Sequence, residues 1–361
     1  MLRRILWCFL AAVLFLSPAH AKGLNAWAYL GWWMPEGWQN VPLSQFERIL
    51  FFDMNIGQDG NIRERHGWPE QWSDLRNAAK ISNTPVDICV TLLDSYSFQK
   101  LFTSPASVGR LTAQLIELAQ QEDVSGVHLD FEAYQTLDAA SIQAFRDFVQ
   151  DVAIQIRTKA PKKQISAFIP IGGHTALYDA VTVAALDRVV LQGYDAHWKE
   201  GRNAGPVAPL DGPYQLTWKK AVAIGKDMGV ATDRLLLSFP LYGYEWRVKD
   251  TGLRSAVIGV GVSSTFARMP KPLGPAFPIS VEEQVLRYGA SYDVDSGSAY
   301  YQYRNNRGQF IQGWFDDWWT LMRKTEYLAQ EQIGGIAFFM LGYDEGQLVN
   351  QFFYRRGLGA Y

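Results

Sequence analysis

The sequence predicts an α/β protein built as a (β/α)8 TIM barrel, with a small α+β or β-hairpin insertion between the seventh and eighth strands. Short, almost continuously apolar runs recur along the chain, which is typical of strands buried on both faces of a parallel sheet. Helical patterns lie between these runs, and such alternation gives parallel strands with right-handed crossovers. The first run ends in Leu30–Pro35 without a glycine-rich phosphate turn, which favours a barrel over an open doubly wound sheet.

The eight expected strands follow one another at the spacing that a barrel needs. In order along the chain they are Asn25–Trp33, Arg48–Ile56, Val86–Leu93, Val124–Phe131, Gln164–Ile169, Arg188–Tyr194, Arg234–Tyr242 and Gly335–Leu341.

Helices are expected between these strands because apolar residues recur at helical spacing. One predicted stripe is Leu111, Leu115 and Leu118, and a second is Ile142, Phe145, Val149, Val152 and Ile156. Asp316–Glu331 is expected to be the helix before the last strand. The insertion is placed at residues 249–315, and its second half predicts a β-hairpin from Ser298–Tyr303 and Asn305–Phe310.

The first residues predict export. Arg3 and Arg4 precede the apolar run Ile5–Leu16, which is too short to span a bilayer, and Ala19-His20-Ala21 is a small-x-small cleavage site. We expect residues 1–21 to be a signal peptide, and residues 22–361 to be one catalytic domain in the periplasm or the medium with no integral membrane segment.

Cysteine and charge narrow the expectations further. Removal of Cys8 leaves Cys89 alone, which predicts a buried structural thiol and no internal disulfide. Without Arg3 and Arg4 the chain has 32 basic against 36 acidic residues, and no basic stripe marks a nucleic-acid partner. We expect a monomer.

The fourth predicted strand carries alternating polar residues. Strand side chains alternate between faces, so His128, Asp130 and Glu132 point the same way, into the barrel and towards its C-terminal rim. The residues between them are apolar and are expected to face the helices: Val127, Leu129 and Phe131. Two buried carboxyl groups this close need a shared proton or partners. A satisfied core network is the alternative to an active site.

Four stretches resemble signatures of glycoside hydrolase family 18, the chitinase-like barrels. Gly126–Glu132 is similar to that family's D-G-x-D-x-D-x-E strand. The other three, in the same order, are Gln192–Asp195, Pro240–Trp246 and Gly334–Asp344, which resemble its M/Q-x-Y-D, P-x-Y-G-x-x-W and final-strand motifs. His197-Trp198 with Gly205–Leu210 resembles the subgroup of spore-cortex-lytic and LysM-linked hydrolases. The resemblance covers almost the entire chain after the expected signal peptide.

The resemblance implies a retaining reaction in which the substrate's own acetamido group attacks C1. Glu132 would be the general acid and later the base, and Asp130 would orient the acetamido N–H and help hold a proton on Glu132. Tyr194 would donate to the acetamido oxygen, and Asp195 would bond to the sugar. The implied substrates are β-linked N-acetylglucosamine polymers such as peptidoglycan or chitin, with no cofactor and no metal.

Two positions of the motif depart from the family's pattern, because Ser125 and His128 stand where it has Asp. A neutral His128 would act as a polar spacer beside Asp130, whereas a protonated one would lower the pKa of Asp130. We therefore expect a shifted pH optimum, which His128→Asn and His128→Asp would reveal.

Aromatic residues near the strand ends are candidates for sugar binding, because flat rings match the apolar faces of sugars. Phe339 stands where the family has the tryptophan that floors the sugar site, and Met340 where an acid is common. The other candidates for substrate binding are His128, Gln192, Tyr29, Trp32, Trp33, Trp198, Tyr242 and Trp246.

A metal site is a weaker hypothesis. His66 and His174 are isolated in loop-like segments, and no histidine or carboxylate spacing matches a zinc site. A metal held by the residues of the fourth strand would leave Tyr194 and Asp195 unexplained.

Two alternatives to this enzyme stay open. A carbohydrate-binding protein without activity could use the same barrel, since fold alone does not fix function. The presence of Glu132, Asp130, Tyr194 and Asp195 favours an enzyme. A hydrolase of an N-acetylated exopolysaccharide or a protein-linked glycan would use the same chemistry.

Overall fold

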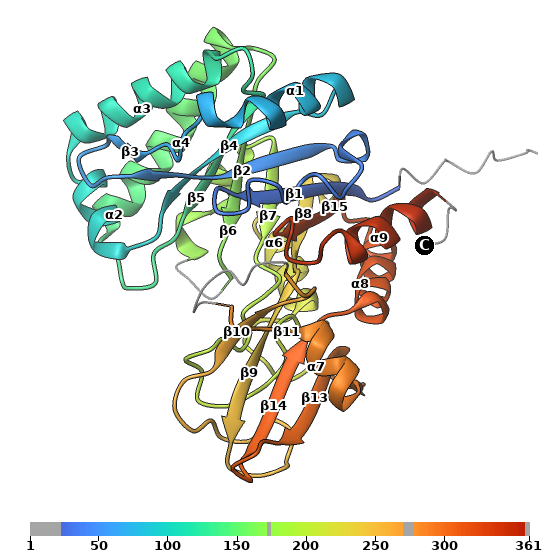
Figure 1. Cartoon of the computed structure of the whole chain (residues 1–361). Coiled ribbons are helices and arrows are strands. Elements are labelled where there is room, and N and C mark those ends of the chain that lie inside the picture. Colours follow the sequence, from blue (N-terminus) through green and yellow to red (C-terminus); the bar gives the residue numbers. More distant parts are fainter. Residues whose placement is uncertain (1–22, 172–174, 270–276, 358–361) are drawn as a thin grey trace, which may run out of the picture.

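The computed structural model describes residues 23–171, 175–269 and 277–357 (Figure 1). The expected signal peptide, residues 1–21, and His174 lie outside these ranges. None of the helices in the described ranges is long and apolar enough to cross a membrane.

Eight parallel strands close into a barrel, which confirms the predicted fold. In spatial order they are β1 (Asn25–Gly31), β15 (Gly335–Phe339), β8 (Leu235–Pro240), β7 (Arg188–Leu191), β6 (Gln164–Ile169), β5 (Gly126–Phe131), β4 (Val86–Leu92) and β2 (Arg48–Ile56). Pairing of β1 with β2 closes the ring, and the short β3 (Ile62–Glu64) extends β2. β5 ends at Phe131 as expected, and Glu132 directly follows it at the C-terminal rim. β7 ends three residues earlier than expected, at Leu191, so the stretch 192–195 follows it in a loop.

Helices cover the outside of the barrel. They are α1 (Ser73–Ser82), α2 (Ser95–Phe102), α3 (Pro105–Gln120), α4 (Ala139–Lys159), α5 (Ala180–Ala184), α6 (Trp218–Asp227), α8 (Trp318–Gln330) and α9 (Gln347–Gly357). The predicted stripe on α3 is buried, as is that on α4 except for the half-buried Ile142. Asp317 caps α8 in a reciprocal pair with Thr320, so this helix begins two residues later than expected.

The alternation predicted for β5 is present. Phe131 packs on its helix-facing side against the rings of Phe102, Phe145 and Phe148. His128 and Asp130 point to the other side, into the barrel interior, where His128 meets groups from β1 and β6. Cys89 is buried as a free thiol, as expected.

A second sheet is added after β8 and is larger than the predicted insertion. Its strands, in spatial order, are β11 (Ile279–Ser280), β10 (Val262–Thr265), β9 (Tyr242–Val248), β14 (Phe310–Phe315), β13 (Ser298–Arg304) and β12 (Ser291–Asp293). Helix α7 (Val281–Tyr288) lies beside it (Figure 1). The predicted hairpin exists as β13 and β14, with the polar residues Asn305–Gln309 as its turn. The sheet begins at Tyr242, seven residues before the expected boundary, because β9 continues almost directly from β8 and pairs with β14.

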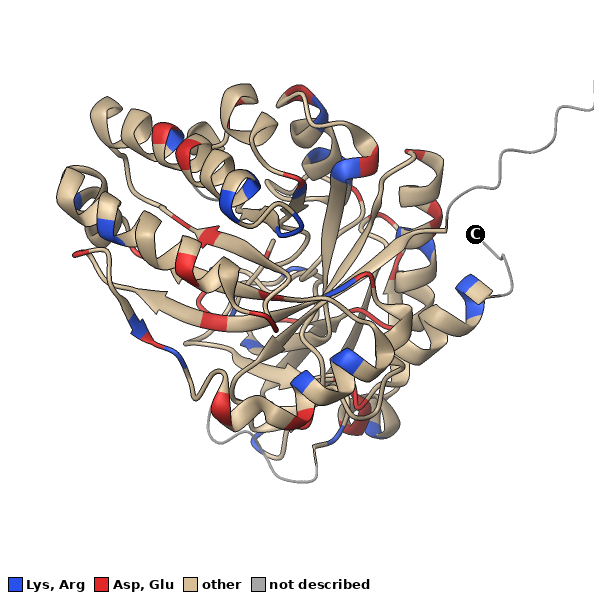
Figure 2. Cartoon of the chain, turned by 90° about the horizontal axis from the view of Figure 1, so that it is seen from above, with Lys and Arg blue, Asp and Glu red and all other residues tan. Residues whose placement is uncertain are grey.

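Acidic and basic residues are mixed over the helices that surround the barrel (Figure 2). Most of the ion pairs on these helices join partly exposed side chains, for example Arg157–Asp187 and Lys226–Glu331. The pair of Lys324 and Asp316 is different, because both side chains are fully buried.

Candidate active site

The carboxyl groups of Asp130 and Glu132 meet at the C-terminal rim of β5. Burial raises the pKa of both groups. The negative charge of Glu132 and a hydrogen bond between the two carboxyls raise the pKa of Asp130 further, while that bond lowers the pKa of Glu132. The pair therefore retains a proton to higher pH than two separate, exposed carboxyl groups would.

One oxygen of this pair is unsatisfied. Asp130 Oδ1 is buried and has no hydrogen-bond partner among the described residues. A buried acceptor without a donor is costly in a folded protein. Such an atom at the mouth of a barrel is suited to a donor that arrives with a ligand.

Tyr134 completes the surroundings of the pair and was missed in the sequence. Its hydroxyl donates a hydrogen bond to Glu132 Oε2, although the residue is 57% exposed. The backbone N–H groups of Tyr134 and Gln135 both donate to Ser95 Oγ at 3.0 Å, which fixes this loop against the start of α2. The only signal in the sequence is an aromatic hydroxyl two positions after the predicted acid.

Tyr194 and Asp195 lie across the barrel mouth in the loop after β7. Asp195 has a positive φ of 64° and accepts hydrogen bonds from Tyr242 at 2.6 Å and from Tyr244 at 3.0 Å. Burial raises the pKa of Asp195 to about 6, and both tyrosines oppose this shift. Tyr194 is buried and makes no hydrogen bond through its hydroxyl to the residues that the structure describes.

Tyr244 also escaped the sequence analysis, although it lies inside the Pro240–Trp246 stretch. Alternation along β9 places Tyr242, Tyr244 and Trp246 on one face, and the first two reach Asp195. Their donor role depends on where β9 lies relative to the barrel, which motif spacing does not specify.

Phe339, the expected floor of the sugar site, lies among the aromatic rings at this end of the barrel. It is half-buried, and its ring centroid lies 5.3 Å from those of Tyr29 and Tyr194 and 5.6 Å from that of Phe52. Phe339 thus connects the ring of Tyr194 to those of Tyr29 and Phe52.

Three predicted substrate contacts are wrong because the side chains are buried beneath the site. His128 is 0% exposed, and its ring nitrogens contact the Tyr29 hydroxyl at 3.0 Å and Ser166 Oγ at 2.8 Å. Burial lowers the pKa of His128 to about 3, so the ring is neutral. The Tyr29 hydroxyl makes its hydrogen bond to His128 and is also buried. Trp246 has almost no exposed surface, and its indole N–H donates to the Lys199 carbonyl at 3.2 Å.

Gln192 also has a supporting position. Its buried side-chain oxygen accepts the Ile171 N–H at 2.9 Å, which ties the ends of β6 and β7 together. Trp32 and Trp198 keep exposed faces, at 41% and 49%, and remain suited to stacking on a sugar. Trp33 is half-buried and donates to the Tyr343 hydroxyl at 3.0 Å.

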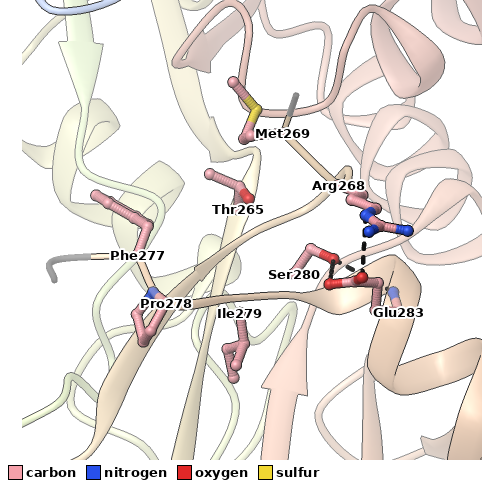
Figure 3. Close-up of a pocket in the computed structure, with 8 residues that line it drawn as sticks. All are labelled: Thr265, Arg268, Met269, Phe277, Pro278, Ile279, Ser280 and Glu283. Carbon is pink, nitrogen blue, oxygen red and sulfur yellow. Dashed lines mark hydrogen bonds and ion pairs between the residues drawn. The ribbon is translucent and has the colours of Figure 1, made fainter. Parts of the chain in front are cut away.

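Two pockets lie outside this constellation. One of about 370 Å³ is at the ends of β1 and β15, with Trp33 and Glu345 among its lining residues. Another of about 490 Å³ lies in the added sheet (Figure 3) and is lined by Thr265, Arg268, Met269, Phe277, Pro278, Ile279, Ser280 and Glu283. In this pocket Arg268 forms an ion pair with Glu283 at 3.1 Å, and the Ser280 hydroxyl donates a hydrogen bond to the same carboxylate at 3.1 Å. None of the predicted site residues lines this pocket.

No group of three or more His, Cys, Asp and Glu side chains within the described ranges is arranged to hold a metal ion.

A closed parallel barrel with two neighbouring carboxyl groups at its C-terminal rim is an arrangement typical of glycoside hydrolases of barrel fold. The family profile described as Glycosyl hydrolases family 18 matches residues 25–344. The chain belongs to this family.

Relatives agree with the predicted subgroup. The chain is 23% identical over 255 residues to the uncharacterized glycosylase YvbX of Bacillus subtilis. The aligned residues are 67% of this chain and 64% of that protein. It is 20% identical over 313 residues to the cortical fragment-lytic enzyme of Bacillus anthracis, and the aligned residues are 81% of this chain and 64% of that enzyme. The chain therefore spans less than two thirds of the length of these relatives.

Solved structures share the fold. The spore cortex-lytic enzyme SleL of Bacillus cereus superimposes with a TM-score of 0.69 at 16% identity, over 91% of this chain and 74% of that one. The family 18 chitinase of Cycas revoluta in complex with (GlcNAc)3 superimposes with a TM-score of 0.75 at 18% identity, over 92% and 99%.

Proposed function

We propose that the chain is an exported, retaining glycoside hydrolase that acts by substrate-assisted catalysis on β-linked N-acetylglucosamine glycans such as peptidoglycan or chitin. The observation that carries this proposal is the buried Asp130 Oδ1, which has no hydrogen-bond partner among the described residues and belongs to the carboxyl group beside Glu132. The acetamido N–H of an N-acetylated sugar is a donor that fits this atom. The similarity to a cortical fragment-lytic enzyme and to a chitinase in complex with (GlcNAc)3 supports this class of glycan.

The reaction uses the shared proton. When the acetamido N–H donates to Asp130, it stabilises the carboxylate of Asp130, and the proton passes to Glu132. Glu132 then protonates the glycosidic oxygen as the bond from C1 to that oxygen breaks. The acetamido carbonyl oxygen forms a bond to C1 and gives an oxazolinium ion, with Tyr194 donating to that oxygen.

The second half of the reaction regenerates the protein. The Glu132 carboxylate takes a proton from a water molecule, whose oxygen attacks C1 and breaks the bond to the acetamido oxygen. Two displacements at C1 give overall retention. Asp195, held by Tyr242 and Tyr244, is placed to accept a hydrogen bond from the sugar, and Phe339 supports its apolar face.

The decisive experiment compares residues 22–361 with the Glu132→Gln variant on chitooligosaccharides and on purified peptidoglycan, scoring new reducing ends. We expect Glu132→Gln to lose a factor of about 10² to 10⁴ in rate while it still binds glycan. Glu117→Gln on the exposed face of α3 is the matched control and should retain full activity.

Two outcomes would overturn the proposal. Wild-type protein that binds N-acetylated glycans but releases no reducing ends would be a carbohydrate-binding protein. An active enzyme that is insensitive to a 2-acetamido thiazoline inhibitor would not use the acetamido group. Hydrolysis restricted to an N-acetylated exopolysaccharide would keep the mechanism and change the substrate.

A further inference from the structure

Asp53 on β2 is a buried carboxylate that belongs to none of the recognised motifs. Asp53 is an inserted residue in the pairing of β2 with β4, because Phe52 pairs with Cys89 and Met54 pairs with Val90, the next residue of β4. Such a bulge re-aims the side chain of the inserted residue. Here the carboxyl is 5% exposed and is held by groups of the barrel interior.

The hydrogen bonds of Asp53 place it one strand away from the carboxyl pair. Thr91 Oγ1 and Asn55 Nδ2 both donate to Asp53 Oδ2, the latter at 2.7 Å. Thr91 is also the register partner of Asp130 on the adjacent β5. In a parallel ladder such partners lie side by side on the same face of the sheet. Asp53, Thr91 and Asp130 therefore form a row across three neighbouring strands.

The other oxygen of Asp53 faces His66. The distance from Asp53 Oδ1 to His66 Nε2 is 3.7 Å, and that nitrogen is buried without a hydrogen-bond partner among the described residues. The His66 ring stacks on Trp32, with ring centroids 4.2 Å apart and an interplanar angle of 5°. The row thus continues outward to an exposed tryptophan.

We propose that Asp53 is a third carboxylate of the reaction centre, a positioning residue whose negative charge keeps the shared proton on the Asp130–Glu132 pair. This inference rests on the proposed function and deepens it, because the shared proton is the one that reaches the leaving group. Asp53 touches no reacting atom and acts only through the pair.

The electrostatics agree in sign with this role. Burial and then Glu132 have the largest effects on the pKa of Asp130, and the charge of Asp53 raises it further. The groups that interact with Asp53 are Thr91 and Asn55, the imidazole of His66, the Cys89 thiol and the carboxyl of Asp130. Thr91, His66 and Asn55 each oppose the effect of burial on the pKa of Asp53 and so favour its charged form.

The test is Asp53→Asn, which keeps the shape and an acceptor oxygen but removes the charge. The carboxyl pair should then lose its proton about one pH unit lower. We expect the basic limb of kcat/KM on chitooligosaccharides to move down by that amount, with KM nearly unchanged. Asp147→Asn, a surface carboxylate on α4, is the control and should leave the profile in place.

A readout that needs no turnover separates this inference from the proposed function. Carbon-13 NMR titration of the Asp and Glu carboxyls should show the Asp130 signal titrating at lower pH in Asp53→Asn than in wild type. If wild type is inactive but the Asp130 signal shifts in Asp53→Asn, the proposed function is refuted and the inference on Asp53 is supported. An active wild type with unchanged titration and pH profile in Asp53→Asn would overturn the inference.

If Asp53→Asn does not fold, the titration of wild type alone decides. Ionisation of Asp53 should produce a second inflection in the Asp130 signal, because the two charges interact. A single inflection in Asp130 across the range in which Asp53 titrates would contradict the coupling.

Discussion

The Tyr242 hydroxyl donates a 2.6 Å hydrogen bond to Asp195 Oδ1 and so connects the first strand of the added sheet to the rim of the barrel. Tyr244, two residues along the same strand, donates to the same oxygen at 3.0 Å. The added sheet therefore supplies donors to the active site as well as a wall beside it.

Removing the first donor with Tyr242→Phe should raise the pKa of Asp195 above its present value of about 6, because the bond stabilises the ionised form. Asp195 then ionises only at higher pH, so the acidic limb of kcat/KM should move upward. Loss of one hydrogen bond to a charged group should lower kcat/KM roughly tenfold at pH 6. Tyr301→Phe, which removes a 3.0 Å bond to Glu245 in the same sheet, should leave the limb in place. Equal profiles for Tyr242→Phe and wild type would refute the role.

Tyr134→Phe should act on the opposite limb. The hydrogen bond from Tyr134 lowers the pKa of Glu132, so its loss raises that pKa and preserves the acid form to higher pH. We expect the basic limb of kcat/KM to shift upward by about half a pH unit or more. Tyr354→Phe, on the exposed face of α9, is a control for the loss of a tyrosine hydroxyl. A downward shift in Tyr134→Phe would show that the hydroxyl does not stabilise the Glu132 carboxylate.

His128→Asn should leave the pH–rate profile unchanged above about pH 5, contrary to the shift expected from the sequence. The reason is that burial holds the pKa of His128 near 3, so the ring carries no charge in this range. An unfolded histidine has a pKa of about 6.5, so the unfolded chain binds more protons between these values. Stability of wild type should therefore fall as pH drops from about 6.5 towards 3.

In His128→Asn this pH-dependent component should be absent, which urea unfolding at pH 7 and pH 5 measures directly. His128→Phe tests the hydrogen bonds instead, because it leaves Tyr29 and Ser166 without their partner, at about 1–3 kcal/mol. A wild type whose stability is flat over this range would mean that His128 is not buried as a neutral ring.

The fully buried pair of Lys324 and Asp316 predicts a large effect on stability. Lys324→Met leaves an unpaired buried carboxylate and should cost about 3–5 kcal/mol in free energy of unfolding at pH 7. Burial already raises the pKa of Asp316, and loss of Lys324 raises it more, so the folded variant gains a proton as pH falls and recovers stability.

Urea denaturation at pH 7 and pH 5 tests this expectation. The double variant Lys324→Met/Asp316→Leu should regain most of the loss, since no charge is then left buried. Lys226→Met, which breaks a partly exposed pair with Glu331, should cost less than about 1 kcal/mol. Equal losses for Lys324→Met and Lys226→Met would contradict the argument.

Much of the fold follows from the sequence because a parallel barrel has a strong local signature. Apolar runs mark strands that are buried on both faces, and their alternation with helices leaves few topologies. Some strand ends were less well defined, since the stretch 192–195, expected to lie mostly in a strand, continues past β7 into a loop. Hydrophobic patterns mark what is buried, whereas a strand ends where its ladder of hydrogen bonds ends.

The sequence by itself determined which residues are the candidates for the chemistry. Asp130 and Glu132 share a strand face by alternation alone, and Tyr194 and Asp195 lie in a stretch similar to the family's motif. It also led to the wrong conclusion that Tyr29, His128 and Trp246 contact substrate, because residue type does not reveal depth within a barrel.

Only the tertiary structure decided how those residues are surrounded. Tyr134, Tyr244 and Asp53 reach the site from a loop, an added strand and a bulge on another strand. Their contributions depend on distances across strands and loops, which fix hydrogen bonds and charge interactions that motif spacing leaves open. The physical reason is that strand alternation places side chains within a few residues, whereas protonation depends on every charged and polar group that the fold brings near.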